Sequence, residues 1–535
     1  MRKFFSRIVG KNFPRAFAPI LGILILLPTS AQAGYNPMYA QIWPKVPSIG
    51  FTANEDISTN MRTESWIHGM YYAEGQSSGL YFREKECNSV DDEACAKAES
   101  VAINVILPAC QSLPISDCVE GLSFTKEGLT PVAAEYKSER SSDFKQGKPA
   151  LNLPTGGSIS TWRVPGALNS LDTDLYAVNV HMEFQNFKGT NCPDLSACPF
   201  HIATFSAEVV PIKVESETAS DICLWRTKTE CGATGTFPEK TRVSLSLRIS
   251  KNLTGFLFGR MEDIDVEVKT YNSSLNQLRV EGLPINIPGI YAFVPKAALS
   301  SYPKIDEYWK KYLATFRPDE LKNPDTFNPG PWPRFALPYA LAYENEVKTS
   351  HVVKSVWKFG NGFGTGNGSP CFAKTDSLFG IVSTNAAVYS PDPPTFRDGS
   401  LDFQVGGAHY LDDGKTLTKG TYDLAITSEF ARCLYGFKDA PIQASVSITT
   451  ADGGEQNVAT QIVRQDKAKK WVFLSAKSFT FSSPVLKVKL TQNASQPDSP
   501  LATAKSKTIK CTKGATKKKV SGANPKCPSG FKKTA

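Results

Sequence analysis

One short motif carries residue types that could perform nucleophilic chemistry. Residues 75–79 (GQSSG) fit G-x-S-x-G, the nucleophile elbow in which a strained turn between a strand and a helix exposes a reactive serine. Residues 80–83 (LYFR) have the pattern of a strand, and no alternation of strands and helices follows them. We therefore predict that 75–79 is the loop of a β-hairpin.

A second group of residues could bind a metal. Cys192, Cys198 and His201 would supply three ligands of a zinc site, but zinc sites commonly space their cysteines by about two to four residues and need a fourth ligand. The chain has five histidines and no H-E-x-x-H motif, which disfavours metallohydrolase chemistry. A disulfide is the favoured interpretation of Cys192 and Cys198.

Glycine-rich and acidic stretches could hold anions or cations. Residues 359–369 (FGNGFGTGNGS) lack both the G-K-[S/T] ending of a phosphate loop and the G-x-G-x-x-G spacing. Residues 172–174, Asp263 with Asp265, and 412–414 offer carboxylates without the roughly twelve-residue spacing of a calcium loop, so we expect turn and surface roles. The sequence thus predicts no catalytic, cofactor-binding or metal-ligating residue, and no cofactor.

The twelve cysteines are even in number and all follow residue 33, where the export signal described below ends. In an exported chain, such a number indicates disulfides. Spacing alone does not prove connectivity. Our hypothesis is nearest-neighbour pairing, which gives five short loops and one long one: Cys87 with Cys95, Cys110 with Cys118, Cys192 with Cys198, Cys223 with Cys231, Cys371 with Cys433, and Cys511 with Cys527.

Residues 1–33 have the pattern of an export signal. Five basic residues precede the apolar run 20–27 (ILGILILL), and 31–33 (AQA) offers small residues for cleavage before Gly34. The apolar stretch 16–27 contains Pro19 and is shorter than the roughly 20 residues of a membrane span. We expect a secreted or envelope-associated, extracytoplasmic protein with no transmembrane segment after cleavage.

The formal charge of +9 is unevenly distributed. Residues 1–33 hold five of the basic residues and 505–535 hold ten lysines and no acidic residue, which leaves −6 for the segment between them. This asymmetry indicates a tail that meets an anionic cell-wall polymer or other surface glycan, rather than a nucleic-acid-binding protein. The candidate contact residues are Lys510, Lys513, Lys517, Lys518, Lys519, Lys526, Lys532 and Lys533.

Period-2 alternation predicts a β-rich chain. It is clearest in 175–187, where apolar residues from Tyr176 to Phe184 share one face. We expect this face to be buried in the core and the other face to be exposed to solvent. The strands predicted in 34–316 are 66–72, 79–82, 101–107, 175–187, 202–214, 242–249 and 264–268. The acidic residues 91–93 predict a short helix through Cys95, and a polar stretch near 137–150 marks a long loop or a domain boundary.

The pattern changes at 303–316, where apolar residues at helical spacing predict an amphipathic helix with an aromatic stripe packed on a sheet. Residues 317–350 are proline-rich and form the predicted main linker. Six candidate strands then predict a second β-sandwich-like domain over 351–491: 401–405, 421–427, 443–449, 458–464, 471–476 and 485–490.

Residues 492–504 form a polar linker, and 505–535 form the Lys-rich tail. Strands at 508–511 and 516–520 around Lys513 and Gly514, closed by Cys511–Cys527, favour a folded module over a solvated tail. The expected fold class is mainly β, with two or more disulfide-stapled, β-sandwich-like domains, one amphipathic helix and a small C-terminal hairpin module.

Two stretches carry a resemblance to a known group of proteins. These are TIKCTKGATKKKVSGANPKCPSGFKK, and the second β region from GSLDFQVGGAHYLDDG through GTYDLAITSEFARCLYGFKDAPIQASVSITT to FTFSSPVLKVKLTQ. Both resemble uncharacterised secreted, cell-surface proteins of freshwater actinobacteria. The resemblance implies export and recurring cell-surface modules, carries no catalytic residue with it, and leaves 34–350 unexplained.

Two functions are compatible with these observations. The leading hypothesis is an exported, non-enzymatic envelope or extracellular protein that displays binding surfaces and contacts anionic wall polymers through its basic tail. The rival is a secreted glycan-active enzyme, because two carboxylates placed by a fold need no fixed spacing in sequence. The sequence names neither the ligand nor the oligomeric state.

Overall fold

The computed structural model describes most of the chain between residues 46 and 534. The described residues are 46–53, 64–72, 82–110, 117–139, 147–189, 192–216, 223–316, 352–361, 370–373, 377–390, 392–411, 413–437, 442–449, 455–456, 460–466, 468, 470–481, 485–492, 507–514, 516–522, 527 and 530–534. The predicted signal at 1–33, the linker at 317–350, and the linker at 492–504 after its first residue lie outside these ranges.

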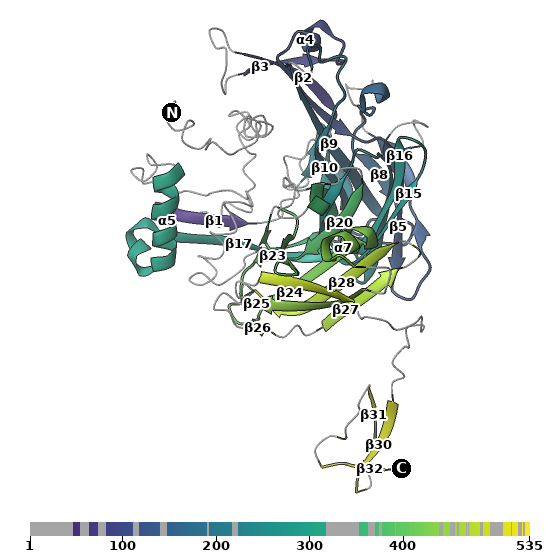
Figure 1. Cartoon of the computed structure of the whole chain (residues 1–535), viewed down its shortest axis with the longest axis vertical. Helices are drawn as coiled ribbons and strands as arrows, with labels where there is room; N and C mark the ends of the chain where they lie inside the picture. The colour runs from purple at the N-terminus through teal and green to yellow at the C-terminus, as the bar shows by residue number, and fades with distance from the viewer. Residues whose placement is uncertain are drawn as a thin grey trace. The chain divides into compact units, whose positions relative to one another are not determined.

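The described structure is mainly β, as predicted, and divides into two compact units. One takes in the described residues of 1–438 and 443–491, and the other those of 439–442 and 492–535. Figure 1 shows the strands of both units along the chain.

The largest sheet has fifteen strands, and its main path runs β27-β28-β24-β20-β14-β19-β10-β9-β4-β2-β3. Neighbours on this path are antiparallel except for the parallel pair β14 and β20. Its members are β2 (Trp66–Tyr72), β3 (Phe82–Cys87), β4 (Ser100–Ile106), β7 (Glu135–Glu139), β8 (Ser160–Arg163), β9 (Leu175–Phe187), β10 (Ile202–Ser216), β11 (Cys223–Arg226), β12 (Glu230–Thr234), β14 (Gly255–Arg260), β19 (Lys358–Asn361), β20 (Leu378–Thr384), β24 (Lys419–Thr427), β27 (Thr460–Asp466) and β28 (Trp471–Thr480).

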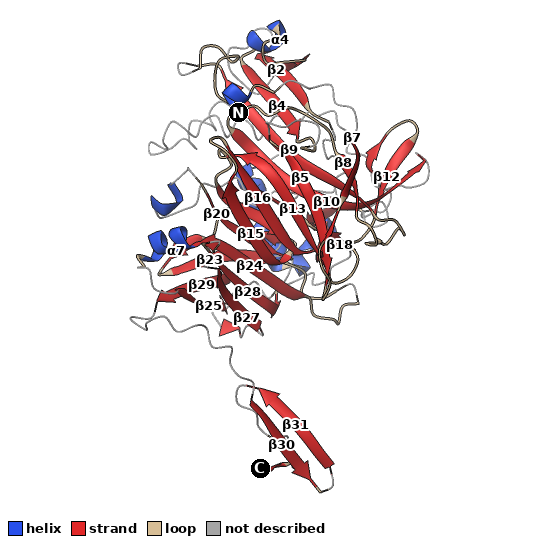
Figure 2. Ribbon diagram, turned by 90° about the vertical axis from the view of Figure 1, so that its right-hand side faces the viewer, coloured by secondary structure: helices blue, strands red, loops and turns tan. Residues whose placement is uncertain are grey.

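A five-stranded antiparallel sheet packs on the large one. Its strands are β5 (Cys118–Lys126), β6 (Val132–Ala133), β13 (Thr241–Ser250), β15 (Glu262–Thr270) and β16 (Leu275–Leu283). Val243, Leu245 and Leu247 of β13 are fully buried and belong to the same apolar cluster as Val180 and Met182 of β9. The alternation predicted for 242–249 therefore places one face of β13 in a sandwich core, and Figure 2 shows the two layers.

Three smaller sheets complete the described β structure. Their strands are β1 (Ser48–Ala53), β17 (Ile285–Pro295) and β18 (Val352–Val356) in the first; β21 (Val388–Tyr389), β22 (Thr395–Arg397), β23 (Ser400–Gly406), β25 (Ile442–Thr449), β26 (Glu455–Gln456) and β29 (Val485–Gln492) in the second; and β30 (Lys507–Lys513), β31 (Thr516–Gly522) and β32 (Lys532–Thr534) in the third. The third lies entirely in the smaller unit.

The predicted helix at 303–316 is confirmed as α5 (Pro303–Phe316), in which Ile305 and Trp309 are buried. The short helix expected after Asp92 is α4 (Glu93–Ala96). Helix α7 (Ser428–Tyr435) was not predicted from the sequence, and Thr427 caps it by accepting a hydrogen bond from the Phe430 amide. The described residues also include the short 3₁₀ helices η2 (Pro149–Leu151), η3 (Lys296–Ser301) and η5 (Pro370–Ala373).

The prediction for 175–187 is only partly correct. Tyr176, Val178, Val180, Met182 and Phe184 are buried on one face of β9, as expected. The opposite face is not exposed to solvent along its whole length, because Asn179 is only 2% exposed. A second apolar cluster, which contains Ala177 of β9 together with Val210 and Trp225, covers the first part of that face.

The predicted boundary at 317–350 does not separate the β structure into independent sheets. β14, which precedes that segment, pairs with β19 and β20, which follow it. The main apolar cluster likewise contains residues from Ile67 to Phe473. The reason is that the interior strands of one sheet need neighbours on both edges, and β14 finds both of its neighbours beyond the segment. The described residues of 34–316 and 351–491 therefore share a sheet and a core.

Candidate functional site

The six disulfides are the first feature with a functional meaning. The structure pairs all twelve cysteines as nearest-neighbour pairing predicted, with sequence separations of 6 to 16 residues for five pairs and 62 for Cys371–Cys433. Disulfides of this density persist in oxidising compartments. They indicate an extracellular protein.

The motifs weighed in the sequence have structural roles where the structure describes them. Residues 75–79 lie outside the described ranges, but the flanking strands β2 and β3 pair antiparallel, as a hairpin requires. Cys192 bonds Cys198, and Asp413 accepts hydrogen bonds from the amides of Lys415 and Thr416. Within the described part of the chain, no three His, Cys, Asp or Glu side chains gather as a metal site.

No helix among the described residues has the length and apolar character needed to cross a membrane.

The candidate site in the smaller unit is a three-stranded antiparallel sheet with the order β31-β30-β32. The hairpin predicted at 508–511 and 516–520 is confirmed as β30 and β31, and β32 adds a third strand that the sequence analysis missed. Cys511 is fully buried and bonds Cys527. The sheet therefore brings lysines from three chain segments together in one covalently closed module.

Strand alternation divides these lysines between two faces, because directly paired residues and every second residue along a strand share a face. Cys511 pairs with Lys518 on one side and Lys533 on the other, so these two lysines lie on the face of the disulfide, together with Lys513. The Lys518 ammonium lies 5.4 Å from the centre of the Phe531 ring on that face. We call this the disulfide face.

The opposite face carries Lys510, Lys517, Lys519 and Lys532, all exposed, and we call it the lysine face. Lys510 of β30 is directly opposite Lys519 of β31, and Thr512 lies between Lys517 and Lys532. Like charges directly opposite one another destabilise a strand pair, and 505–535 contains no acidic side chain. Lys526, the remaining candidate, lies outside the described residues.

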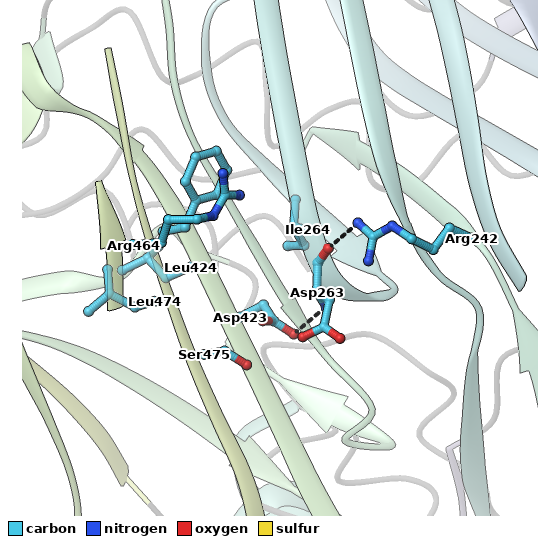
Figure 3. Close-up of a pocket in the computed structure, with 9 residues that line it drawn as sticks. Arg242, Asp263, Ile264, Asp423, Leu424, Arg464, Leu474 and Ser475 are labelled. Atoms are coloured by element: carbon cyan, nitrogen blue, oxygen red, sulfur yellow. Dashed lines mark hydrogen bonds between the residues drawn. The ribbon is translucent and has the colours of Figure 1, made fainter. Parts of the chain in front are cut away.

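The larger unit holds a second cluster, where β15 of the five-stranded sheet meets β24 and β28 of the large sheet (Figure 3). Asp423 is 3% exposed and accepts a hydrogen bond from the Asp263 amide over 3.3 Å. Burial raises the pKa of Asp423 to about 7; the nearby Asp263 and Glu262 act in the same direction, while Ser475 and Lys477 oppose them.

Basic side chains hold the other carboxylates of this cluster. The Lys477 ammonium lies 2.9 Å from Asp263 Oδ1 and 3.1 Å from Glu262 Oε2. Arg242 donates to the Asp263 carbonyl oxygen over 2.7 Å and to Glu281 over 2.8 Å. The sequence signal for this cluster is Asp423 itself, a lone carboxyl in the otherwise uncharged strand TYDLAIT, and the sequence analysis did not single it out.

A buried carboxyl beside a second carboxyl is an arrangement that general acid and base chemistry uses. The cavity beside Asp423, however, has a volume of about 200 Å³, which is below the roughly 300–1,000 Å³ typical of ligand pockets. Its walls are also tied together by the ion pairs of Lys477. We therefore assign this cluster to joining the two sheets, and it does not favour the glycan-active alternative.

No protein family model, curated protein or solved structure matches this chain.

Proposed function

We propose that this chain is an exported, non-enzymatic protein that is retained at the cell envelope by contact between its C-terminal lysine module and an anionic wall polymer. The disulfide-stapled sheets of the larger unit then display surfaces for binding outside the cell. The six disulfides support the extracellular setting. The uneven charge, with ten lysines and no acid in 505–535, supports the polymer contact.

One observation carries the proposal. The sheet of the smaller unit holds exposed Lys517, Lys519 and Lys532 on one face, and 505–535 contains no acidic side chain. A solvated tail would reduce the repulsion between its lysines by spreading its charges, whereas a closed sheet fixes the charges side by side. An anionic polymer that crosses the face would neutralise these lysines, and its affinity would rest on that neutralisation.

Deletion of 505–535 tests the proposal. We expect the intact chain to be bound to isolated cell walls at low salt and released at about 1 M salt, where charges are screened within about 3 Å. The truncated chain should appear in the released fraction at every salt concentration. If it stays wall-bound as well as the intact chain, the module is not the anchor.

A second variant separates charge from architecture. Cys511→Ser/Cys527→Ser keeps all ten lysines and removes the bond that closes the module. We expect it to bind the walls more weakly than the intact chain and more strongly than the deletion. Wall binding that equals the intact chain would show that flexible charge is sufficient and that the fixed face has no role.

A further inference from the structure

The two faces of the C-terminal sheet are not equivalent. The disulfide face is partly occupied by its own contacts: Lys518 lies over the Phe531 ring, and the Lys513 ammonium approaches Gly530, where an added Cβ would lie 3.1 Å from it. On the lysine face, Lys517, Lys519 and Lys532 are exposed around Thr512. A partner that needs several cations at once therefore meets a more regular array on the lysine face.

Resting on the function proposed above, we propose that the lysine face binds a linear phosphodiester polymer of the polyol phosphate class, which lies along β31. Lys517 and Lys519 are two residues apart on that strand, so their Cα atoms are separated by about 6.8 Å. An extended chain advances about 3.5 Å for every three backbone bonds. Phosphates joined through a three-carbon polyol are six bonds apart, so they are separated by about 7 Å. The two spacings agree.

The side-chain chemistry favours phosphodiesters over planar carboxylates. The segment 505–535 contains ten lysines and no arginine. Arginine is the residue that recognises carboxylates through two parallel hydrogen bonds, while lysine acts as a point charge that tolerates many approach directions. A phosphodiester presents two charged oxygens without one required plane. A row of lysines can therefore contact successive phosphates of such a backbone without requiring one fixed orientation of each phosphate.

The same face is poorly suited to a lipid surface. Binding of a protein to an anionic membrane combines basic residues with apolar side chains that enter the interface. The described side chains of the lysine face are Lys510, Lys517, Lys519, Lys532 and Thr512. Phe531 contacts Lys518, which belongs to the disulfide face. The lysine face thus offers charge and no apolar anchor.

Two triple variants with equal charge change test the inference in the full chain. Lys517→Gln/Lys519→Gln/Lys532→Gln alters the lysine face, and Lys513→Gln/Lys518→Gln/Lys533→Gln alters the disulfide face. Binding to synthetic poly(glycerol phosphate) is measured by calorimetry at several salt concentrations. Intact disulfides, checked by mass spectrometry, show that each variant remains closed.

We expect the lysine-face variant to lose affinity about fivefold per lysine, or roughly a hundredfold in total. The slope of log affinity against log salt should fall in magnitude by about 2, as for three lost contacts to a single-stranded polyanion. The disulfide-face variant should lose less than about tenfold, since its cations contribute only through long-range attraction.

Equal losses in the two variants would overturn the assignment to one face and leave wall retention by charge intact. Retention of the 505–535 deletion on walls would instead overturn the proposed function itself. Two further probes test the ligand class. Equal affinity for polygalacturonate, a carboxylate polymer, would overturn the phosphodiester assignment, and tighter binding to phosphatidylglycerol vesicles would show a membrane-binding face.

Discussion

Replacement of Asp423 by Asn should remove a large pH dependence from the stability of the larger unit. Asp423 is buried between the two sheets, and burial raises its pKa from 3.8 to about 7. In the unfolded chain the same carboxyl returns to its ordinary pKa. Between pH 4 and 7 the folded state therefore binds more protons than the unfolded state, so its stability falls as the pH rises.

The magnitude follows from the distance between the two pKa values. Each pKa unit corresponds to about 1.4 kcal/mol, so ionisation of Asp423 costs the folded state about 4 kcal/mol at and above pH 7. Between pH 5 and pH 8 the change is about 3 kcal/mol, because part of the range lies above the folded-state pKa. Asn cannot ionise and keeps an oxygen that can accept from the Asp263 amide, so the variant should escape this loss.

Guanidinium unfolding followed by tryptophan fluorescence at pH 5, 6, 7 and 8 checks this prediction. The variant should gain about 3 kcal/mol relative to the native chain over that range. Asp413→Asn is the control: hydrogen bonds from Thr416 hold the pKa of exposed Asp413 below its usual value, so its contribution is lost only in acid and stays constant from pH 5 to 8. If the free energies of unfolding of Asp423→Asn and the native chain change with pH in the same way, the raised pKa of Asp423 is refuted.

The remaining predictions concern the disulfides. Alkylation without reductant, read by mass spectrometry, should label none of the twelve cysteines, and labelling of Cys371 or Cys433 would contradict their pairing. Cys371→Ala/Cys433→Ala should lower the free energy of unfolding by about 4 kcal/mol and Cys192→Ala/Cys198→Ala by about 2 kcal/mol, because the two bonds span 62 and 6 residues. Denaturant midpoints measure both, and equal losses would show that loop entropy does not govern these bonds.

Much of the local structure could be predicted because it depends on neighbouring residues. The alternation of Val243, Leu245 and Leu247 with polar residues defines a half-buried strand whatever its partners are, and β13 is that strand. The C-terminal hairpin followed from Gly514 between two lysine-rich segments and from two cysteines within a short span. In both cases the signal lay within about ten to twenty residues.

Strand neighbours could not be predicted in the same way. Neither β14 nor β20 was predicted as a strand, because both are buried along almost their whole length and show no alternation, and their parallel pairing joins residues more than a hundred positions apart. The length and proline content of 317–350 favoured a linker between separate domains, and long-range pairing overrode that local signal. The high pKa of Asp423 was hidden for the same reason, because its burial depends on β15 and β28.

The small size of the C-terminal sheet explains why it is closed by a disulfide. A module of about thirty residues buries too little apolar surface to fold by that means alone. The Cys511–Cys527 bond spans 16 residues and contributes about 3 kcal/mol by the loop-entropy estimate, without taking up an exposed position, since Cys511 is buried. Covalent closure thus offsets the repulsion among the lysines of the sheet, while Lys517, Lys519 and Lys532 stay exposed on the lysine face.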